Sequence, residues 1–235
     1  MNDTYHIDCC WSGRLESDEQ LAQRAAAWFR ELSQIDPLLG RWYLNAKTTA
    51  EAVEFHPTVE VLRDLFTSKA FKDEMGVSFV AWNGRDEPEH CYTNMMSSWS
   101  PGLFPAICTL IPARQEGAFT KRLLTVEALT RVLRAMVRVW EPDCGVATSR
   151  EYLDCLEDSQ RQVPEVYCAW LTYLSARRGK VPPLPEPVRV EPVEDKGTLI
   201  VLTPERFTVD NPWHISLALE VQRTLGEAGL LGPIQ

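Results

Sequence analysis

The sequence lacks the short motifs that mark most enzymes. Its 235 residues contain no G-x-S-x-G nucleophile elbow, no glycine-rich phosphate loop and no H-E-x-x-H metal motif. The four histidines lie far apart along the chain, so they offer no metal-ligand spacing. None of the seven cysteines belongs to a C-x-x-C pair, and we expect reduced thiols. We therefore predict that the chain is not an enzyme and that it binds no cofactor and no metal.

Long apolar runs and an excess of basic residues are also missing. No run is long enough to span a bilayer, and the chain does not open with a charged-then-apolar leader. The formal net charge of -9 argues against direct binding of nucleic acid and suits a basic partner. We expect a cytoplasmic protein that contacts no membrane. A chain of this length buries roughly 70% of its unfolded surface on folding, so its core needs no disulfide staples.

The clearest structural pattern lies near the end of the chain, from Gly197 to Leu231. The continuous apolar run from Leu199 to Leu202 is typical of a strand buried on both faces. Asn211 then offers a helix cap, and Pro212 fits the first helical position. A central strand with a helix packed across it is predicted as the nucleus of an α+β core.

Apolar periodicity extends this prediction to mixed, mainly antiparallel sheets with helices packed on them. Further strands are expected at 5–11, 77–82, 91–99, 106–111, 143–148, 166–174 and 188–193. Further helices are expected at 18–35, 57–66, 126–140 and 149–158, while 41–46 and 49–55 stay ambiguous. The order strand-strand-strand-helix occurs twice. The single domain 1–235 is therefore open to a division into two lobes, about 1–150 and 151–235.

One set of residues imitates a catalytic site. Asp143, Glu194 and Lys196 match the carboxylate–lysine pattern of restriction-type nucleases, in which two carboxylates hold a divalent metal and the lysine stabilises the attacked phosphate. However, the polar cluster around Glu194 separates two apolar strands, as a hairpin turn requires. A metal-dependent nuclease is therefore kept as the alternative function.

Clustered carboxylates and the eight tryptophans point to a protein-binding surface. A short acidic helix is expected after Ser149, and tryptophans that precede a turn or open a helix are expected near the surface. Exposed tryptophan beside charged groups is a common interface composition. The candidate binding residues are Glu151, Asp154, Glu157, Asp158, Trp99 and Trp213.

Three stretches carry a resemblance to a known family. They are the strand Tyr5 to Trp11, the run Trp170-Leu-Thr-Tyr-Leu-Ser175, and the block from Gly197-Thr-Leu-Ile-Val-Leu-Thr203 to Asn211-Pro212 with its closing helix. In these the chain resembles the immunity protein 52 family of bacterial toxin–immunity systems. The resemblance implies a cytosolic antidote that binds a cognate toxin, often one delivered by type VI secretion, and carries over no catalytic residue.

The resemblance also implies the kind of toxin, because the cognate toxins of this family look like restriction-endonuclease-fold DNases. We expect the candidate residues above to contact such a toxin. An adaptor unrelated to toxins is the second alternative. The oligomeric state, and whether inhibition covers the toxin's active site or blocks its assembly, stay open at this level.

Overall fold

The structure, a computed structural model, describes residues 3–12, 14–44, 51–72, 74–98, 105–156 and 166–232. Its strands are β1 (Tyr5–Trp11), β2 (Trp42–Leu44), β3 (Glu54–Phe55), β4 (Gly76–Trp82), β5 (Cys91–Ser98), β6 (Ala106–Pro112), β7 (Cys144–Ser149), β8 (Leu171–Ser175), β9 (Arg189–Val193) and β10 (Gly197–Val201). Its helices are α1 (Asp18–Ile35), α2 (Val59–Thr67), α3 (Ala118–Leu123), α4 (Val126–Trp140), α5 (Arg150–Cys155) and α6 (Pro212–Glu227), with short 3-10 turns at η1 (Pro37–Leu39) and η4 (Ala176–Arg178).

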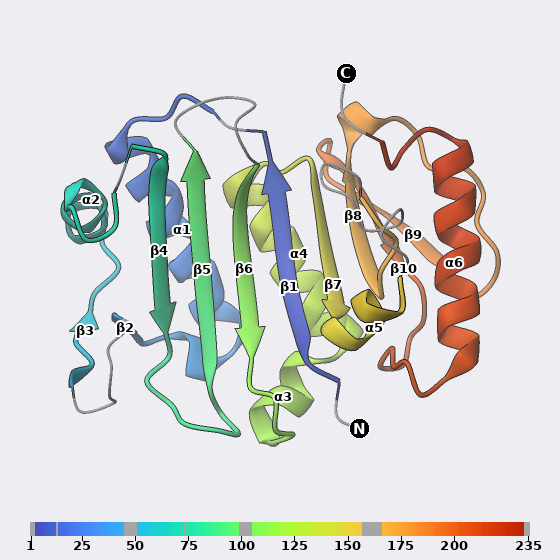
Figure 1. Ribbon diagram of the computed structural model, residues 1–235, viewed down its shortest axis with the longest axis horizontal. Coiled ribbons are helices and arrows are strands. Elements are labelled where there is room, and N and C mark those ends of the chain that lie inside the picture. The colour runs from blue at the N-terminus through green and yellow to red at the C-terminus, as the bar shows by residue number, and fades with distance from the viewer. Residues whose placement is uncertain are drawn as a thin grey trace.

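Within these residues the strands form one ten-stranded sheet in the order β3-β2-β4-β5-β6-β1-β7-β8-β10-β9. Every pairing is antiparallel, so the predicted α+β class with antiparallel pairing is confirmed. Helices α1 and α4 lie behind the central strands in Figure 1, and α6 flanks the end of the sheet that holds β8, β10 and β9.

The N-terminal strand β1 occupies the middle of this sheet. Ile7 pairs with Leu110 of β6 on one side and with Ala147 of β7 on the other. Burial alternates along β1, because successive side chains of a strand point to opposite faces. Its odd-numbered residues are buried on the side of α4, where Trp11 stacks on Trp140 with ring centroids 5.2 Å apart. The even-numbered residues are half-buried on the other face.

Helix α1 begins where the sequence predicts, at a capping box. The Ser17 hydroxyl accepts a hydrogen bond from the Gln20 amide, and the Gln20 side chain accepts one from the Ser17 amide. The apolar face of the helix is buried against the sheet. The Trp28 side chain of α1 is 0% exposed, and its indole donates a 3.1 Å hydrogen bond to the Thr93 hydroxyl of β5. This bond satisfies the one polar atom that the indole takes into the core.

The C-terminal strand and helix form as predicted, but their place in the sheet differs. Leu199 to Leu202 are buried throughout, which confirms burial on both faces, and Asn211 caps α6 through its side chain. The prediction of a central strand is wrong, because β10 is second from the edge. An apolar run reports that both faces are covered, and says nothing of the order in which strands pair.

One further boundary differs from the sequence prediction, and two segments that the sequence left ambiguous are resolved. The strand expected at 166–174 begins only at Leu171, although the residues before it are mostly buried. Trp170 is held there by its indole, which donates to the Thr203 carbonyl at 3.1 Å. The two ambiguous segments contribute short strands, β2 and β3, at the opposite end of the sheet. Local pattern could not specify these boundaries, since buried loops and strands share the same composition.

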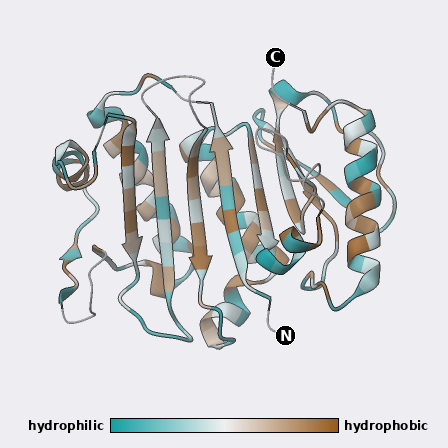
Figure 2. Ribbon diagram, viewed as in Figure 1, coloured by the Kyte–Doolittle hydropathy of each residue, from teal (hydrophilic) through white to brown (hydrophobic). Residues whose placement is uncertain are grey.

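Hydropathy follows the layers of the fold. Figure 2 shows apolar stretches along β4 and β6, whereas α5 is hydrophilic. No helix within the described ranges is both long and apolar enough to cross a membrane.

Strands β7 and β8, on either side of residue 150, pair directly, so both parts of the chain contribute to the same sheet. The division into two lobes stays a prediction.

Two glycines provide a matched test of the packing at the β8–β10 pair. A Cβ at Gly197 would lie 2.2 Å from the Leu174 carbonyl oxygen and 2.9 Å from the Ser175 Cα, whereas a Cβ at Gly226 in α6 meets no described atom within 4 Å. We expect Gly197→Ala to lower the free energy of unfolding by about 2 kcal/mol through overpacking against backbone. Gly226→Ala should raise it by about 0.5 kcal/mol, since alanine favours the helix. Urea denaturation of both variants measures this, and equal effects would contradict it.

Candidate functional site

Helix α5 presents one buried face and one acidic exposed face. Ser149 caps it by accepting a 3.2 Å hydrogen bond from the Tyr152 amide. The Tyr152 ring is 0% exposed and packs edge-on against Phe207, with centroids 5.1 Å apart. Asp154, on the other side of the helix, is exposed. The chain therefore anchors α5 by one aromatic residue and leaves its carboxylate in solvent.

Glu151 is not free in the same way as Asp154. Its two carboxylate oxygens accept hydrogen bonds from the amide of Thr4 at 2.6 Å and from the hydroxyl of Thr4 at 3.1 Å. Burial alone would raise the pKa of Glu151, but these hydrogen bonds and one from its own amide outweigh that effect and lower the pKa. Glu151 thus stays charged and ties α5 to the start of β1.

A hollow of about 610 Å³ opens between α5 and the strands β1, β5 and β6. We call it the α5 hollow. Its wall carries several tyrosine, arginine and histidine side chains, and tyrosine and arginine are over-represented among residues that dominate protein–protein binding. The wall includes His6, Tyr92, Arg114, Arg150, Asp154 and Tyr167. Asp154 therefore lies at the edge of a concave surface that combines aromatic rings with charges of both signs.

Two half-buried titratable residues of β1 lie at and beside the α5 hollow. The His6 Nε2 atom is 3.4 Å from the Asp8 Oδ2 atom. Burial raises the pKa of the Asp8 carboxyl to about 7. Burial, together with the nearby Arg150, lowers the pKa of His6 to about 4. Near neutral pH, His6 is therefore uncharged, and Asp8 is close to its titration midpoint.

An aromatic row connects α5 with the first turn of α6. Phe207, which packs on Tyr152, also stacks on His214 at 5.2 Å, and His214 contacts Trp213 at 5.7 Å. The His214 side chain is 2% exposed; its Nδ1 atom accepts from the Thr208 amide at 3.0 Å. Trp213 is 45% exposed, and the aromatic contacts link it to α5.

Of the six predicted binding residues, Trp99, Glu157 and Asp158 lie outside the described residues. Glu151, Asp154 and Trp213 are described, and the structure connects all three to the region of α5. Their roles in binding stay predictions. Sequence analysis did not identify the arginines and tyrosines of the α5 hollow, because they come from separate segments of the chain and form no local pattern.

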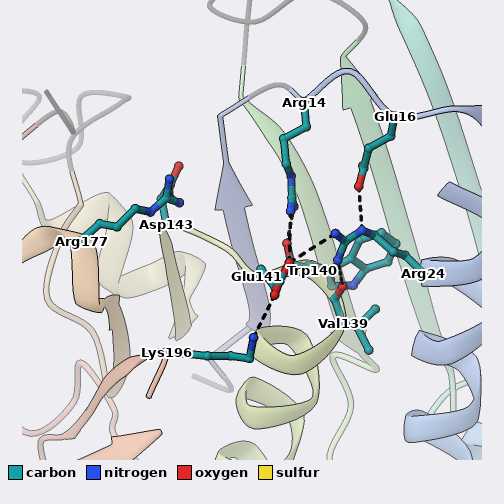
Figure 3. A network of polar contacts seen from close by, with 9 residues as sticks. All are labelled: Arg14, Glu16, Arg24, Val139, Trp140, Glu141, Asp143, Arg177 and Lys196. Carbon is teal, nitrogen blue, oxygen red and sulfur yellow. Dashed lines mark hydrogen bonds and ion pairs between the residues drawn. The ribbon is translucent and has the colours of Figure 1, made fainter. Parts of the chain in front are cut away.

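A second polar region, shown in Figure 3, lies at the opposite end of β1. Its hub is Glu141, which ends α4 in the left-handed conformation with φ 47°. The Glu141 carboxylate contacts Lys196 at 2.9 Å, Arg24 at 3.3 Å and Arg14 at 3.8 Å. The hydrogen bond from Lys196 is the main cause of its lowered pKa. Three cations thus converge on one carboxylate.

The same arginines also cap the C-terminus of α4. Arg14 donates to the Trp140 carbonyl and Arg24 to the Val139 carbonyl. Such carbonyls at a helix end have no partner within the helix and carry the negative end of its dipole, so cations stabilise them. None of these contacts follows from local sequence, since Arg14 is 126 residues away from Trp140.

The nuclease-like set does not come together as a site. Asp143 is buried; one carboxylate oxygen accepts from the Ser12 amide and hydroxyl, and the other pairs with Arg177. Lys196 binds Glu141, and Glu194 occupies the β9–β10 turn with φ 51°. Within the described residues, no group of three or more histidine, cysteine or acidic side chains is placed to hold a metal. The prediction that Glu194 lies in a hairpin turn is confirmed.

Comparison with known proteins identifies the class of this chain and then its family. Residues 3–234 match the sequence model described as Immunity protein 52, which makes the chain an immunity protein by class. It belongs to the immunity protein 52 family. The Pseudomonas aeruginosa T6SS protein PA0821 has a similar fold, with a TM-score of 0.58 and 14% identity, covering 94% of this chain and 76% of that chain. No curated protein matches the sequence.

The raised pKa of Asp8 predicts a pH-dependent effect of Asp8→Asn. A carboxyl whose folded pKa of about 7 exceeds its unfolded value near 3.8 stabilises the fold at low pH, and this contribution is lost as pH rises toward 7. Asparagine mimics the protonated acid. With a side chain 22% exposed, we expect Asp8→Asn to stabilise by about 2 kcal/mol at pH 8, falling to nearly zero at pH 4. Urea denaturation across this pH range measures it; a constant difference would contradict the assignment.

Proposed function

We propose that this protein binds and neutralises a cognate secreted toxin in the cytoplasm and protects the cell that makes it. The observation that carries the proposal is the family match over residues 3–234. The Pseudomonas protein of similar fold is named as a protein of the type VI secretion system, which supports delivery of the toxin by that system. Neutralisation by binding requires no catalytic group in this chain. The proposed partner of the chain is the toxin itself.

The α5 hollow, the exposed face of α5 and Trp213 form the proposed toxin-binding surface. Its composition supports this choice, because exposed tryptophan, tyrosine and arginine commonly dominate binding energy, and charged groups at the rim select the partner. A stable complex needs roughly 800 Å² of buried surface per partner, more than one short helix can supply. The hollow and the first turn of α6 supply the remaining contact area.

The proposed toxin class follows from the family resemblance, because the cognate toxins of this family look like restriction-endonuclease-fold DNases. A DNase exposes a basic surface to DNA, and a partner of net charge -9 with clustered carboxylates is attracted to such a surface. The acidic segment that starts with α5 would stand opposite the toxin's lysines and arginines. In this proposal the charge of the chain speeds association with the toxin, and the aromatic residues slow dissociation of the complex.

Charge reversal in the acidic segment tests this surface. We expect Asp154→Lys, Glu157→Lys and Asp158→Lys together to slow association with the toxin about tenfold at low salt, with a smaller change in dissociation. The difference should shrink as salt rises, because exposed charges are screened beyond roughly 8 Å at physiological ionic strength. Surface plasmon resonance at two salt concentrations measures both rates.

A matched control reverses three exposed acids near the other end of the sheet, Glu51, Glu60 and Asp64. This control makes the same change in net charge far from α5. If both variants slow association equally, only net charge matters and α5 is not the contact. If neither slows it, the acidic segment plays no part in steering.

The nuclease alternative predicts that protection depends on Glu194. In the proposed function Glu194 is only a turn residue with positive φ, so Glu194→Ala should protect cells from the toxin as well as the wild-type protein does. A survival assay with co-expressed toxin measures this. Loss of protection by a variant that still folds and binds the toxin would support a catalytic role.

A further inference from the structure

The polar region at the end of β1 contains a recess of about 450 Å³. We call it the β1-end recess. Trp11, Tyr173 and Ser175 line it together with the charged residues Arg14, Arg177 and Lys196. It is distinct from the α5 hollow, because β1 separates them and a seven-residue strand is roughly 20 Å long. The proposed function makes no use of this recess.

Two buried polar atoms of the residues that line the recess have no hydrogen-bond partner among the described residues. Ser175 is 5% exposed, and its hydroxyl in the wall of the recess is one of them. The buried Nε atom of Arg14 is the other. Buried polar groups are nearly always hydrogen-bonded, so such an atom in a concave wall offers a hydrogen-bonding position that a ligand can occupy. The Arg14 Nε–H can only donate and the Ser175 hydroxyl can also donate, so a ligand that accepts hydrogen bonds fits both groups.

The cations of the recess keep further donors available. The Arg177 side chain is 61% exposed, and one terminal nitrogen of its guanidinium group pairs with the Asp143 carboxylate. Lys196 directs its ammonium, which carries three N–H donors, to the carboxylate of Glu141. That carboxylate is already shared with Arg14 and Arg24. Three cations therefore line the recess, although the chain as a whole is acidic.

The charge of the lining selects among anions. The lining has three cations and two carboxylates, Glu141 and Asp195, so its residues sum to one positive charge. Asp143, which pairs with Arg177, lies outside the lining. A single carboxylate neutralises this charge, whereas a phosphate dianion would leave a net negative charge beside the two acids. We propose that the β1-end recess receives a carboxylate side chain, aspartate or glutamate, presented by the bound protein partner, with the Ser175 hydroxyl among its donors.

This inference rests on the proposed toxin binding and adds a contact of opposite sign. The acidic segment that starts with α5 attracts basic groups, while the recess attracts an acidic one. Alternating signs across an interface fix its register and penalise partners with a different charge pattern. The recess would thus contribute to discrimination between the cognate toxin and other basic proteins.

Ser175→Ala is the sharpest test, because the hydroxyl it removes makes no hydrogen bond to any described residue. The stability of this variant should stay equal to wild type or rise. The toxin should bind about tenfold more weakly, since a hydrogen bond to a charged group is lost and a tenfold change corresponds to about 1.4 kcal/mol.

Thr148→Val is the matched control for Ser175→Ala. Thr148 is also buried, and its hydroxyl likewise has no hydrogen-bond partner within the described part of the chain. It lies in β7, outside the recess. Thr148→Val should therefore leave toxin affinity unchanged.

Sodium acetate probes the recess without the toxin. In a titration followed by NMR, acetate should shift the amide signals of Ser12, Ser175 and Ala176 in the wild-type protein and in Thr148→Val, but not in Ser175→Ala. Sodium chloride and sodium phosphate at equal ionic strength should leave these signals in place. Equal shifts with all three salts, or larger shifts with phosphate, would overturn the proposal.

The toxin measurement separates the two proposals. If the wild-type protein binds the toxin and Ser175→Ala binds it equally well, the recess proposal fails while the proposed function stands. If the wild-type protein does not bind the toxin, the proposed function fails, and the partner assigned to the recess fails with it.

Discussion

The pairing of β1 with both β6 and β7 is the constraint on which the rest of this structure depends. Strand β1 lies between β6 and β7, which follow it by about a hundred residues or more in the sequence. It thereby connects the two parts of one continuous sheet. Such non-local pairing has a large entropic cost, which the burial of residues such as Ile7 and Trp11 offsets. Both candidate contact regions lie at the ends of this strand, so its register positions them.

Charge is distributed unevenly over this frame. The acidic helix α5 lies at one end of β1, and the cations around Glu141 lie at the other end (Figures 1 and 3). Arg14 and Arg24 cap α4 and bind Glu141, so they stabilise the fold as well as shape the recess. A protein that acts by binding one partner benefits from such a pattern, because complementary charges set orientation more than they set affinity.

Aromatic packing connects the acidic helix to the C-terminal part of the chain. Tyr152, Phe207 and His214 form a buried row that ends at the exposed Trp213. A rigid base of this kind lowers the entropy lost when a partner binds, since the side chains near the surface are already ordered. The family membership assigns a class of function, and this arrangement supports the choice of surface proposed for it.

Most helices, most strands and the family can be predicted from the amino-acid sequence alone. Periodicity and caps are local, so the capping box at Ser17 and the helix after Asn211 could be predicted from neighbouring residues alone. Tertiary structure decided the order of the strands, the place of β10 near an edge, and both concave surfaces. Those depend on contacts between residues far apart in the chain, such as Arg14 with Trp140, and no local pattern encodes such contacts.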